Sequence, residues 1–129
     1  MTTPPQISPI RVLIAEDNAD LRTTVISLLE AEPDIRCVAE TGALGDIAQL
    51  AGASGAQLVL LDIEFQGKSS LRSLPDLRLA LPGVRFLVYS GHGTAAIRSA
   101  ALAAGAAGYV VKTGNPEELL LAIRQCMQS

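Results

Sequence analysis

The sequence predicts an α/β fold, a doubly wound parallel sheet of five strands with helices on both of its faces. Apolar runs alternate with segments of helical spacing five times along the chain. Several runs are almost continuously hydrophobic, as strands covered on both faces should be. Repeated strand–helix units of this kind join neighbouring parallel strands through helices. A chain of 129 residues is long enough for one such domain.

The predicted strands correspond to the five apolar runs. They are "IRVLIA" (10–15), "IRCVAE" (35–40), "QLVLLD" (57–62), "VRFLVYS" (84–90) and "AGYVVK" (107–112). Glycine and proline punctuate the joins between the units. The first residues are rich in proline and fit neither pattern, so we expect a flexible tail over 1–9 and one domain over 10–128.

The helical segments differ in the strength of their patterns. The first has an apolar stripe at helical spacing, formed by Leu21, Val25, Leu28 and Leu29. The last, over 115–127, opens with a capping Asn115 and has acidic residues in its first turn. The second, over 42–54, is rich in glycine and alanine. The third, over 69–81, carries Pro75 in its middle, which predicts a kink or a restart there.

Composition excludes several classes of function. The formal charge of -3 and the pI near 5.0 argue against direct binding of nucleic acid by this chain. No apolar run is long enough to cross a bilayer, and the start of the sequence does not resemble a secretory signal. Cys37 and Cys126 match no metal or redox spacing. We therefore expect a protein of the reducing cytoplasm, without membrane contact.

Polar residues stand at the carboxyl ends of four predicted strands. They are Glu16 and Asp17, Asp62, Ser90, and Lys112. Ligands of open parallel sheets bind at this edge, and with the second strand outermost the other four strands are neighbours. Each residue alone has a simpler interpretation: the two aspartates and the serine could cap helices or turns, and the lysine could be a solvated charge. The set favours a shared polar pocket, and Lys112 is one of only two lysines against eight arginines.

Such a pocket favours a particular chemistry. Clustered carboxylates suit Mg²⁺, which uses one or two carboxylates together with water and phosphate oxygens. A metal ion would keep Asp62 ionised as a nucleophile among its acidic neighbours. Because phosphoryl transfer requires mainly positioning and charge neutralisation, Lys112 and the Ser90 hydroxyl could complete the site.

These residues resemble the receiver domain of two-component response regulators. The likeness runs from about 10 to 128 and rests on "VLIAEDN", "LVLLDI", "FLVYSG" and "GYVVK" in order. The separations also suit a receiver: 45 positions from Asp17 to Asp62, 28 to Ser90 and 22 more to Lys112. The end of the chain looks most like receivers that precede a helix-turn-helix DNA-binding domain. The resemblance implies a flavodoxin-like (βα)5 fold with strand order 2-1-3-4-5.

The resemblance also implies residue roles. Asp62 would accept a phosphoryl group from a histidine kinase or phosphotransfer protein, with Lys112 and Ser90 assisting. Mg²⁺ would be held by the side chains of Asp17 and Asp62 and the backbone carbonyl of Glu64, and Glu16 would help mainly through water. Ser90 and Tyr109 would switch the face formed by the fourth helix, fifth strand and fifth helix. That face would control output, transcription being the expected one, and could support a homodimer. Such a domain is a switch and not a turnover enzyme.

The sequence departs from the family pattern after Asp62. Many receivers have proline four residues after the acceptor aspartate and glycine eight after it; here these are Gln66 and Ser70. The loop "EFQGKSS" is therefore expected to be differently shaped or looser. Thr113 replaces the proline that often follows the lysine, so a cis peptide bond is not expected there.

Two further residues bear on the lifetime of a phosphorylated form. Glu64 and His92 lie two positions beyond Asp62 and Ser90, where side chains in this family flank the path of the hydrolytic water. An acid facing an imidazole could close that path, more firmly with the histidine protonated. The simpler interpretation is that both side chains are in solvent.

Other classes of function remain as alternatives. A degenerate receiver would act as a dimerisation or docking module without phosphorylation, and the unusual loop is what favours it. A phosphatase of the haloacid dehalogenase type would want a second aspartate where Glu64 stands. A serine hydrolase would need the G-x-S-x-G elbow, which "YSGHG" is not. A nucleotide-binding module would need a glycine-rich loop where "AEDNAD" stands.

Overall fold

The computed structural model describes residues 8–91 and 93–128, and the predicted tail over 1–9 therefore falls mostly outside the described residues. Within the described chain, five parallel strands form one sheet in the order β2-β1-β3-β6-β7. Their bounds are β1 Ile10–Ala15, β2 Ile35–Thr41, β3 Leu58–Asp62, β6 Arg85–Ser90 and β7 Gly108–Val111. In chain order this is 2-1-3-4-5, so the predicted fold and strand order are confirmed.

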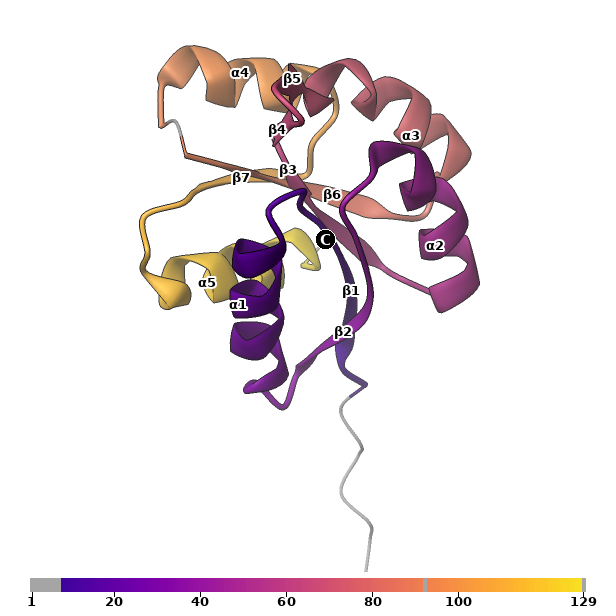
Figure 1. The fold of residues 1–129 in the computed structure, drawn as a ribbon, viewed down its shortest axis with the longest axis vertical. Coiled ribbons are helices and arrows are strands. Elements are labelled where there is room, and N and C mark those ends of the chain that lie inside the picture. The colour runs from indigo at the N-terminus through magenta and orange to yellow at the C-terminus, as the bar shows by residue number, and fades with distance from the viewer. Residues whose placement is uncertain (1–7, 92, 129) are drawn as a thin grey trace, which may run out of the picture.

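Helices cover both faces of the sheet (Figure 1). They are α1 Ala19–Glu30, α2 Ile47–Ser54, α3 Leu74–Ala80, α4 Ala95–Ala103 and α5 Pro116–Cys126. Alternate residues of each central strand enter opposite cores: Leu13 and Val59 pack with α2, α3 and α4, whereas Val12 and Leu58 pack with α1 and α5. All of β3, from Leu58 to Asp62, is buried, which explains its unbroken apolar run.

The helix boundaries follow local sequence signals. The Asn18 side chain caps α1 by accepting from the Leu21 N–H at 3.0 Å, and Asn115 caps α5 in the same way. Pro75 lies in the first turn of α3, after the short 3₁₀ turn η2 Ser70–Arg72, so the predicted restart is confirmed. The segment 42–54 likewise begins as a 3₁₀ turn, η1 Leu44–Asp46, before α2.

The loop after Asp62 forms a small antiparallel hairpin that the sequence did not predict. Its strands are β4 Glu64–Phe65 and β5 Lys68–Ser69. Gln66 and Gly67, with φ of 51° and 76°, both take the left-handed conformation of a two-residue hairpin turn. The expected difference in shape is therefore an ordered hairpin, which in Figure 1 lies beside α4.

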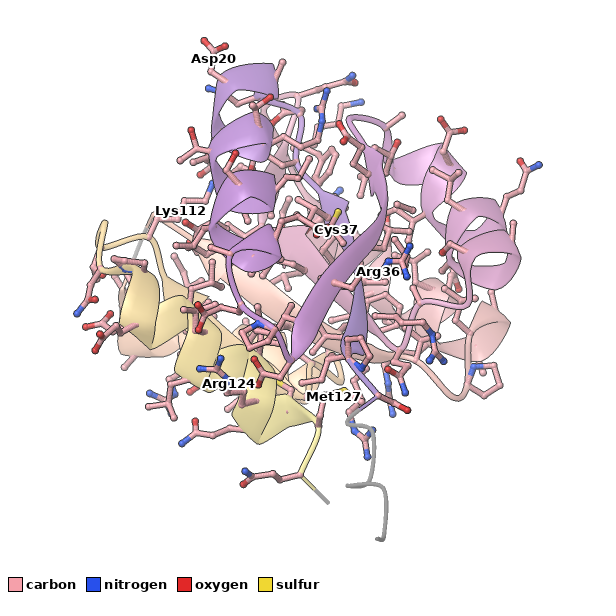
Figure 2. The ribbon with its side chains drawn as sticks, turned by 90° about the horizontal axis from the view of Figure 1, so that it is seen from below. Asp20, Arg36, Cys37, Lys112, Arg124 and Met127 are labelled. Atoms are coloured by element: carbon pink, nitrogen blue, oxygen red, sulfur yellow. The ribbon has the colours of Figure 1, made fainter. Side chains whose placement is uncertain are left out.

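An ion-pair cluster fastens α5 to the turn between α1 and β2. The Arg124 guanidinium donates to both carboxylate oxygens of Asp34, at 2.7 and 2.8 Å, and to Glu32 at 2.9 Å. In Figure 2, Arg124 on α5 lies toward the C-terminal end of α1, and Asp20 marks the opposite end of that helix. Arg124 holds the pKa of Asp34 below its ordinary value through this bidentate hydrogen bond. The cluster is remote from the strand ends that carry the polar residues.

Two predictions drawn from composition can be compared with the fold. Cys37 is half-buried and Cys126 buried, both as free thiols, and burial raises the pKa of Cys37 to about 11. Neither thiol is therefore in an environment that favours a reactive thiolate. Among the described residues, no helix has the length and apolar character needed to span a bilayer.

Candidate functional site

The strand-end residues meet at the carboxyl edge of the sheet, because β1, β3, β6 and β7 are consecutive neighbours. Asp62 pairs with Tyr89 across β3 and β6, and Ser90 pairs with Val111 across β6 and β7. A cavity of about 290 Å³ opens there. Its lining includes Glu16, Asp17, Asp62, Glu64 and Lys112.

Lys112 is the cation of this cavity. Its Nζ donates to Asp62 Oδ1 at 3.1 Å and to Glu16 Oε2 at 3.2 Å. Glu16 and Asp62 are 4% and 5% exposed, so their charges are compensated by protein groups more than by water. The interpretation of Lys112 as a solvated surface charge is therefore wrong. Figure 2 shows it between α1 and the loop that leads into α5.

The cavity strongly perturbs one carboxyl group. Burial, followed by the hydrogen bond and charge of Asp62, raises the pKa of Glu16 to about 7. The Asn18 N–H at 3.1 Å and the Lys112 charge act in the opposite direction. Burial disfavours the charge on Lys112, but the hydrogen bonds and charges of Asp62 and Glu16 outweigh it and raise its pKa. The cavity thus holds more negative charge than one lysine can balance.

The arrangement of carboxylates fits a hard cation. Glu16, Asp17 and Asp62 each offer one oxygen, and these oxygens lie within 4.8 Å of one another. Asp17 is exposed, which leaves an open side for water or a phosphate oxygen. Carboxylate oxygens with room for water are what Mg²⁺ requires, so the donor set and its access fit that ion.

The capping interpretations of the serine and the first aspartate are not supported. Asn18 caps α1, while Asp17 Oδ2 instead accepts from the Gln66 N–H at 2.7 Å. Thr94 caps α4, and Ser90 is fully buried. Asp62 does take part in a turn, since its Oδ1 accepts from the Glu64 N–H at 3.2 Å, but the same oxygen also pairs with Lys112.

Besides the contact of the Gln66 N–H with Asp17, sequence reasoning missed two features near the site. The Lys112 Nζ lies 5.0 Å from the centroid of the Tyr89 ring, a cation–π contact that helps to hold the ammonium. The Ser70 hydroxyl is fully buried and donates to the Asp62 carbonyl oxygen at 2.6 Å. The position of Tyr89 next to Ser90 was the available signal for the cation–π contact. Nothing in the local sequence indicated the hydrogen bond of Ser70, because it joins the two ends of a hairpin that was not predicted.

Of the remaining predicted residues, the structure places Glu64 at the cavity and Tyr109 away from it. Glu64 is exposed and contributes to the lining. Tyr109 is half-buried on β7, where it packs on the core shared with α4, away from the lining of the cavity. His92 lies outside the described residues.

A larger cavity of about 910 Å³ lies at the opposite end of the strands, against α3 and the loop after α4. The ionisable residues of its lining are Arg78 and Arg85, and that lining contains no carboxylate, thiol or hydroxyl. That cavity therefore offers no nucleophile and no carboxylate ligand, in contrast to the smaller cavity at the carboxyl edge.

The family comparison agrees with this geometry. The sequence pattern of the response regulator receiver domain matches residues 12–124. The chain belongs to this family. The match covers β1 from residue 12, the other four strands of the sheet, and the four strand ends that carry the polar residues of the cavity.

This receiver is similar in sequence to curated response regulators. It is 33% identical over 120 residues to the nitrate/nitrite response regulator protein NarP of Escherichia coli, covering 93% of this chain and 56% of the relative. It is 34% identical over 117 residues to NarL of the same species, covering 91% and 54%. The chain thus spans about half the length of the curated relatives it matches.

Solved structures agree with the fold of the receiver. A two-component response regulator of the LuxR family from Aurantimonas sp. superposes with a TM-score of 0.83 at 28% identity. That match covers 91% of this chain and 84% of the solved chain.

Proposed function

We propose that this receiver is a phosphorylation switch in which Asp62 accepts a phosphoryl group. The observation that carries the proposal is the pairing of Asp62 with Lys112 at 3.1 Å inside a cavity lined by three further carboxylates. Asp62 ends a strand that is otherwise wholly apolar and buried. A carboxylate is kept at such a position only where partners compensate its charge.

Mg²⁺ is the proposed cofactor, held by the side chains of Asp17 and Asp62 and the backbone carbonyl of Glu64, with Glu16 acting mainly through water. When bound, the ion would neutralise the negative charge that a phosphate donor brings to the carboxylates. The protein positions these groups through the strand ends of β1 and β3 and through the N–H groups of Asn18 and Gln66, which hold Glu16 and Asp17.

Lys112 and Ser90 are the proposed groups that receive the phosphoryl oxygens. The ammonium already lies beside the Asp62 oxygen, so it can pair with a phosphoryl group attached there. Ser90 is buried on the neighbouring strand, and its carbonyl accepts from the Lys112 N–H at 2.7 Å. A shift of Ser90 toward the phosphoryl group, together with Tyr109, would alter the face formed by α4, β7 and α5.

The proposed donor is a histidine kinase or a phosphotransfer protein, and the proposed output is control of transcription. Relatives that are named as transcriptional regulators support that output, and this chain matches just over half of their length. The altered face would act on an output module or through a homodimer. We propose that the protein acts in the cytoplasm as a switch and not as a turnover enzyme.

A docking module without phosphorylation is the second candidate, favoured by the hairpin that replaces the usual loop after Asp62. The two candidates differ in one measurement. The protein is incubated with acetyl phosphate and Mg²⁺, and its intact mass is recorded beside Asp62→Asn and metal-free controls. Gain of one phosphoryl group, lost in both controls, is expected. A folded protein that binds Mg²⁺ but gains no mass would contradict the proposal and favour the docking module.

A further inference from the structure

The β4–β5 hairpin joins two of the candidate metal ligands. Its base is fixed at Asp62, where the Ser70 hydroxyl donates to the carbonyl at 2.6 Å and the Glu64 N–H donates to Oδ1 at 3.2 Å. Its tip reaches Asp17, whose Oδ2 accepts from the Gln66 N–H at 2.7 Å. One short element thus contacts ligands from two different strand ends.

The hairpin turn determines the direction of the Gln66 N–H. Gln66 has a φ of 51° and Gly67 a φ of 76°, and Phe65 pairs with Lys68 across the turn. Phe65 is only 2% exposed, so the hairpin is anchored in the core as well as at Asp62. The contact to Asp17 therefore depends on the main chain and not on the glutamine side chain. Many receivers have proline at this position, but in this hairpin proline could not make the contact, because it lacks the N–H and cannot adopt the positive φ of Gln66.

Asp17 needs such support more than its neighbours do. Glu16 and Asp62 are buried and paired with Lys112, whereas the Asp17 side chain is exposed. An exposed carboxylate loses rotational freedom when it ligates an ion, which weakens binding. A short hydrogen bond to one of its oxygens orders the group beforehand and leaves the other oxygen for the ion.

We propose that Gln66 is a positioning residue for the metal site, whose main-chain N–H orients Asp17 for the cation. This inference rests on the proposed function, since it takes the cluster as the Mg²⁺ site. It assigns to the hairpin a role that the residue type at position 66 does not reveal.

The first test is the affinity for Mg²⁺, measured by titration calorimetry in three variants. Gln66→Ala and Gln66→Gly keep the N–H, and glycine also adopts positive φ without strain. Both are expected to bind Mg²⁺ as the unmodified protein does. Gln66→Pro removes the N–H and is expected to bind about tenfold or more weakly, the usual effect of losing a group that orients a ligand. Equal affinity of Gln66→Pro and Gln66→Gly would overturn the inference.

A second measurement does not depend on the folding of the proline variant. Amide hydrogen exchange is followed by NMR in the unmodified protein and in Asp17→Ala, both without metal. The Gln66 amide is expected to be protected in the first and to exchange faster in the second. The Ser70 amide, which donates to the Ile63 carbonyl at 2.7 Å, is the internal control and should stay protected in both. An equal exchange rate for the Gln66 amide in the two proteins would refute the contact.

Failure of this inference is distinguishable from failure of the proposed function. If Mg²⁺ affinity depends on the Gln66 N–H but Asp62 gains no phosphoryl group, the positioning role stands and the phosphorylation switch does not. If Asp62 is phosphorylated and Gln66→Pro binds Mg²⁺ as Gln66→Gly does, the positioning role alone is wrong.

Discussion

At the residue scale, the electrostatics of the site depend on Glu16, which is buried beside Asp62. Its pKa of about 7 in the folded protein lies above the ordinary value of 4.5, so ionisation of Glu16 opposes folding. The stabilising contribution of the protonated form is complete below about pH 4.5 and is lost as the pH rises through about 7. A metal ion bound by the cluster would offset this loss.

Glu16→Gln should therefore stabilise the metal-free protein in a pH-dependent way. We expect its free energy of unfolding to exceed that of the unmodified protein by about 1–2 kcal/mol near pH 8, the shift being discounted for the open side of the cavity. The difference should shrink toward pH 5, where both side chains are neutral. Urea unfolding with a chelator, at several pH values, measures it. The exposed Glu117→Gln is the charge-matched control, and a difference independent of pH would contradict the account.

The lifetime of the phosphorylated form is expected to depend on Glu64 and His92. If a carboxylate and an imidazole flank the path of water to Asp62, Glu64→Ala and His92→Ala should each speed dephosphorylation. The effect should be larger near pH 6, where histidine is protonated, than near pH 8. Loss of phosphoryl mass with time provides the rate. Unchanged rates in both variants across this range would show that the two side chains do not act on the water.

At the element scale, the strands could be predicted because β1 and β3 are buried on both faces, which leaves a continuous apolar signature. The hairpin could not be predicted. Its strands are two residues long, and a glutamine occupies a positive-φ position that favours asparagine or glycine. For the same reason, the contacts of Ser70 and Gln66 to the site had no local signal, whereas the residues at the strand ends did.

Ser70→Ala should destabilise the fold through the base of the hairpin. It removes the hydroxyl that donates to the buried Asp62 carbonyl and leaves that oxygen without this donor. We expect the free energy of unfolding to fall by about 1–2 kcal/mol, as for other lost buried hydrogen bonds. Denaturant unfolding measures the loss, with the exposed Ser27→Ala on α1 as a control that should change little. Equal stability of the two variants would mean that the hydroxyl is not a structural donor.

The attachment of α5 through Arg124 and Asp34 should behave as one coupled unit. Arg124→Ala and Asp34→Ala should each lower the thermal midpoint. Because both remove the same bidentate contact, the double variant should be at least as stable as the less stable of the two single variants. Arg124 lowers the pKa of Asp34 from its ordinary value of 3.8. This stabilisation is therefore present above about pH 3.8 and is lost as the pH falls through the lowered pKa of the folded protein. Strictly additive effects near neutral pH would contradict the coupling.

At the scale of the whole molecule, the strand order brings together residues that are far apart in the sequence. Lys112 and Glu16 are separated by 96 positions and lie 3.2 Å apart, because the order β2-β1-β3-β6-β7 places their strands on the same side of β2. A parallel sheet orients all its strand ends alike, so the carboxyl edge collects the polar residues of the cavity. The predicted set of polar residues followed from this topology, and their exact partners required the structure.

The central claim is that Asp62 is the residue modified in this cavity, and the most direct test locates the modification. The protein is phosphorylated with acetyl phosphate and Mg²⁺ and then reduced with borohydride, which converts an aspartyl phosphate into homoserine. Peptide mass mapping is expected to find homoserine at position 62 and only when Mg²⁺ was present. Modification of Asp17 or Glu16 instead, or of position 62 without metal, would contradict the account.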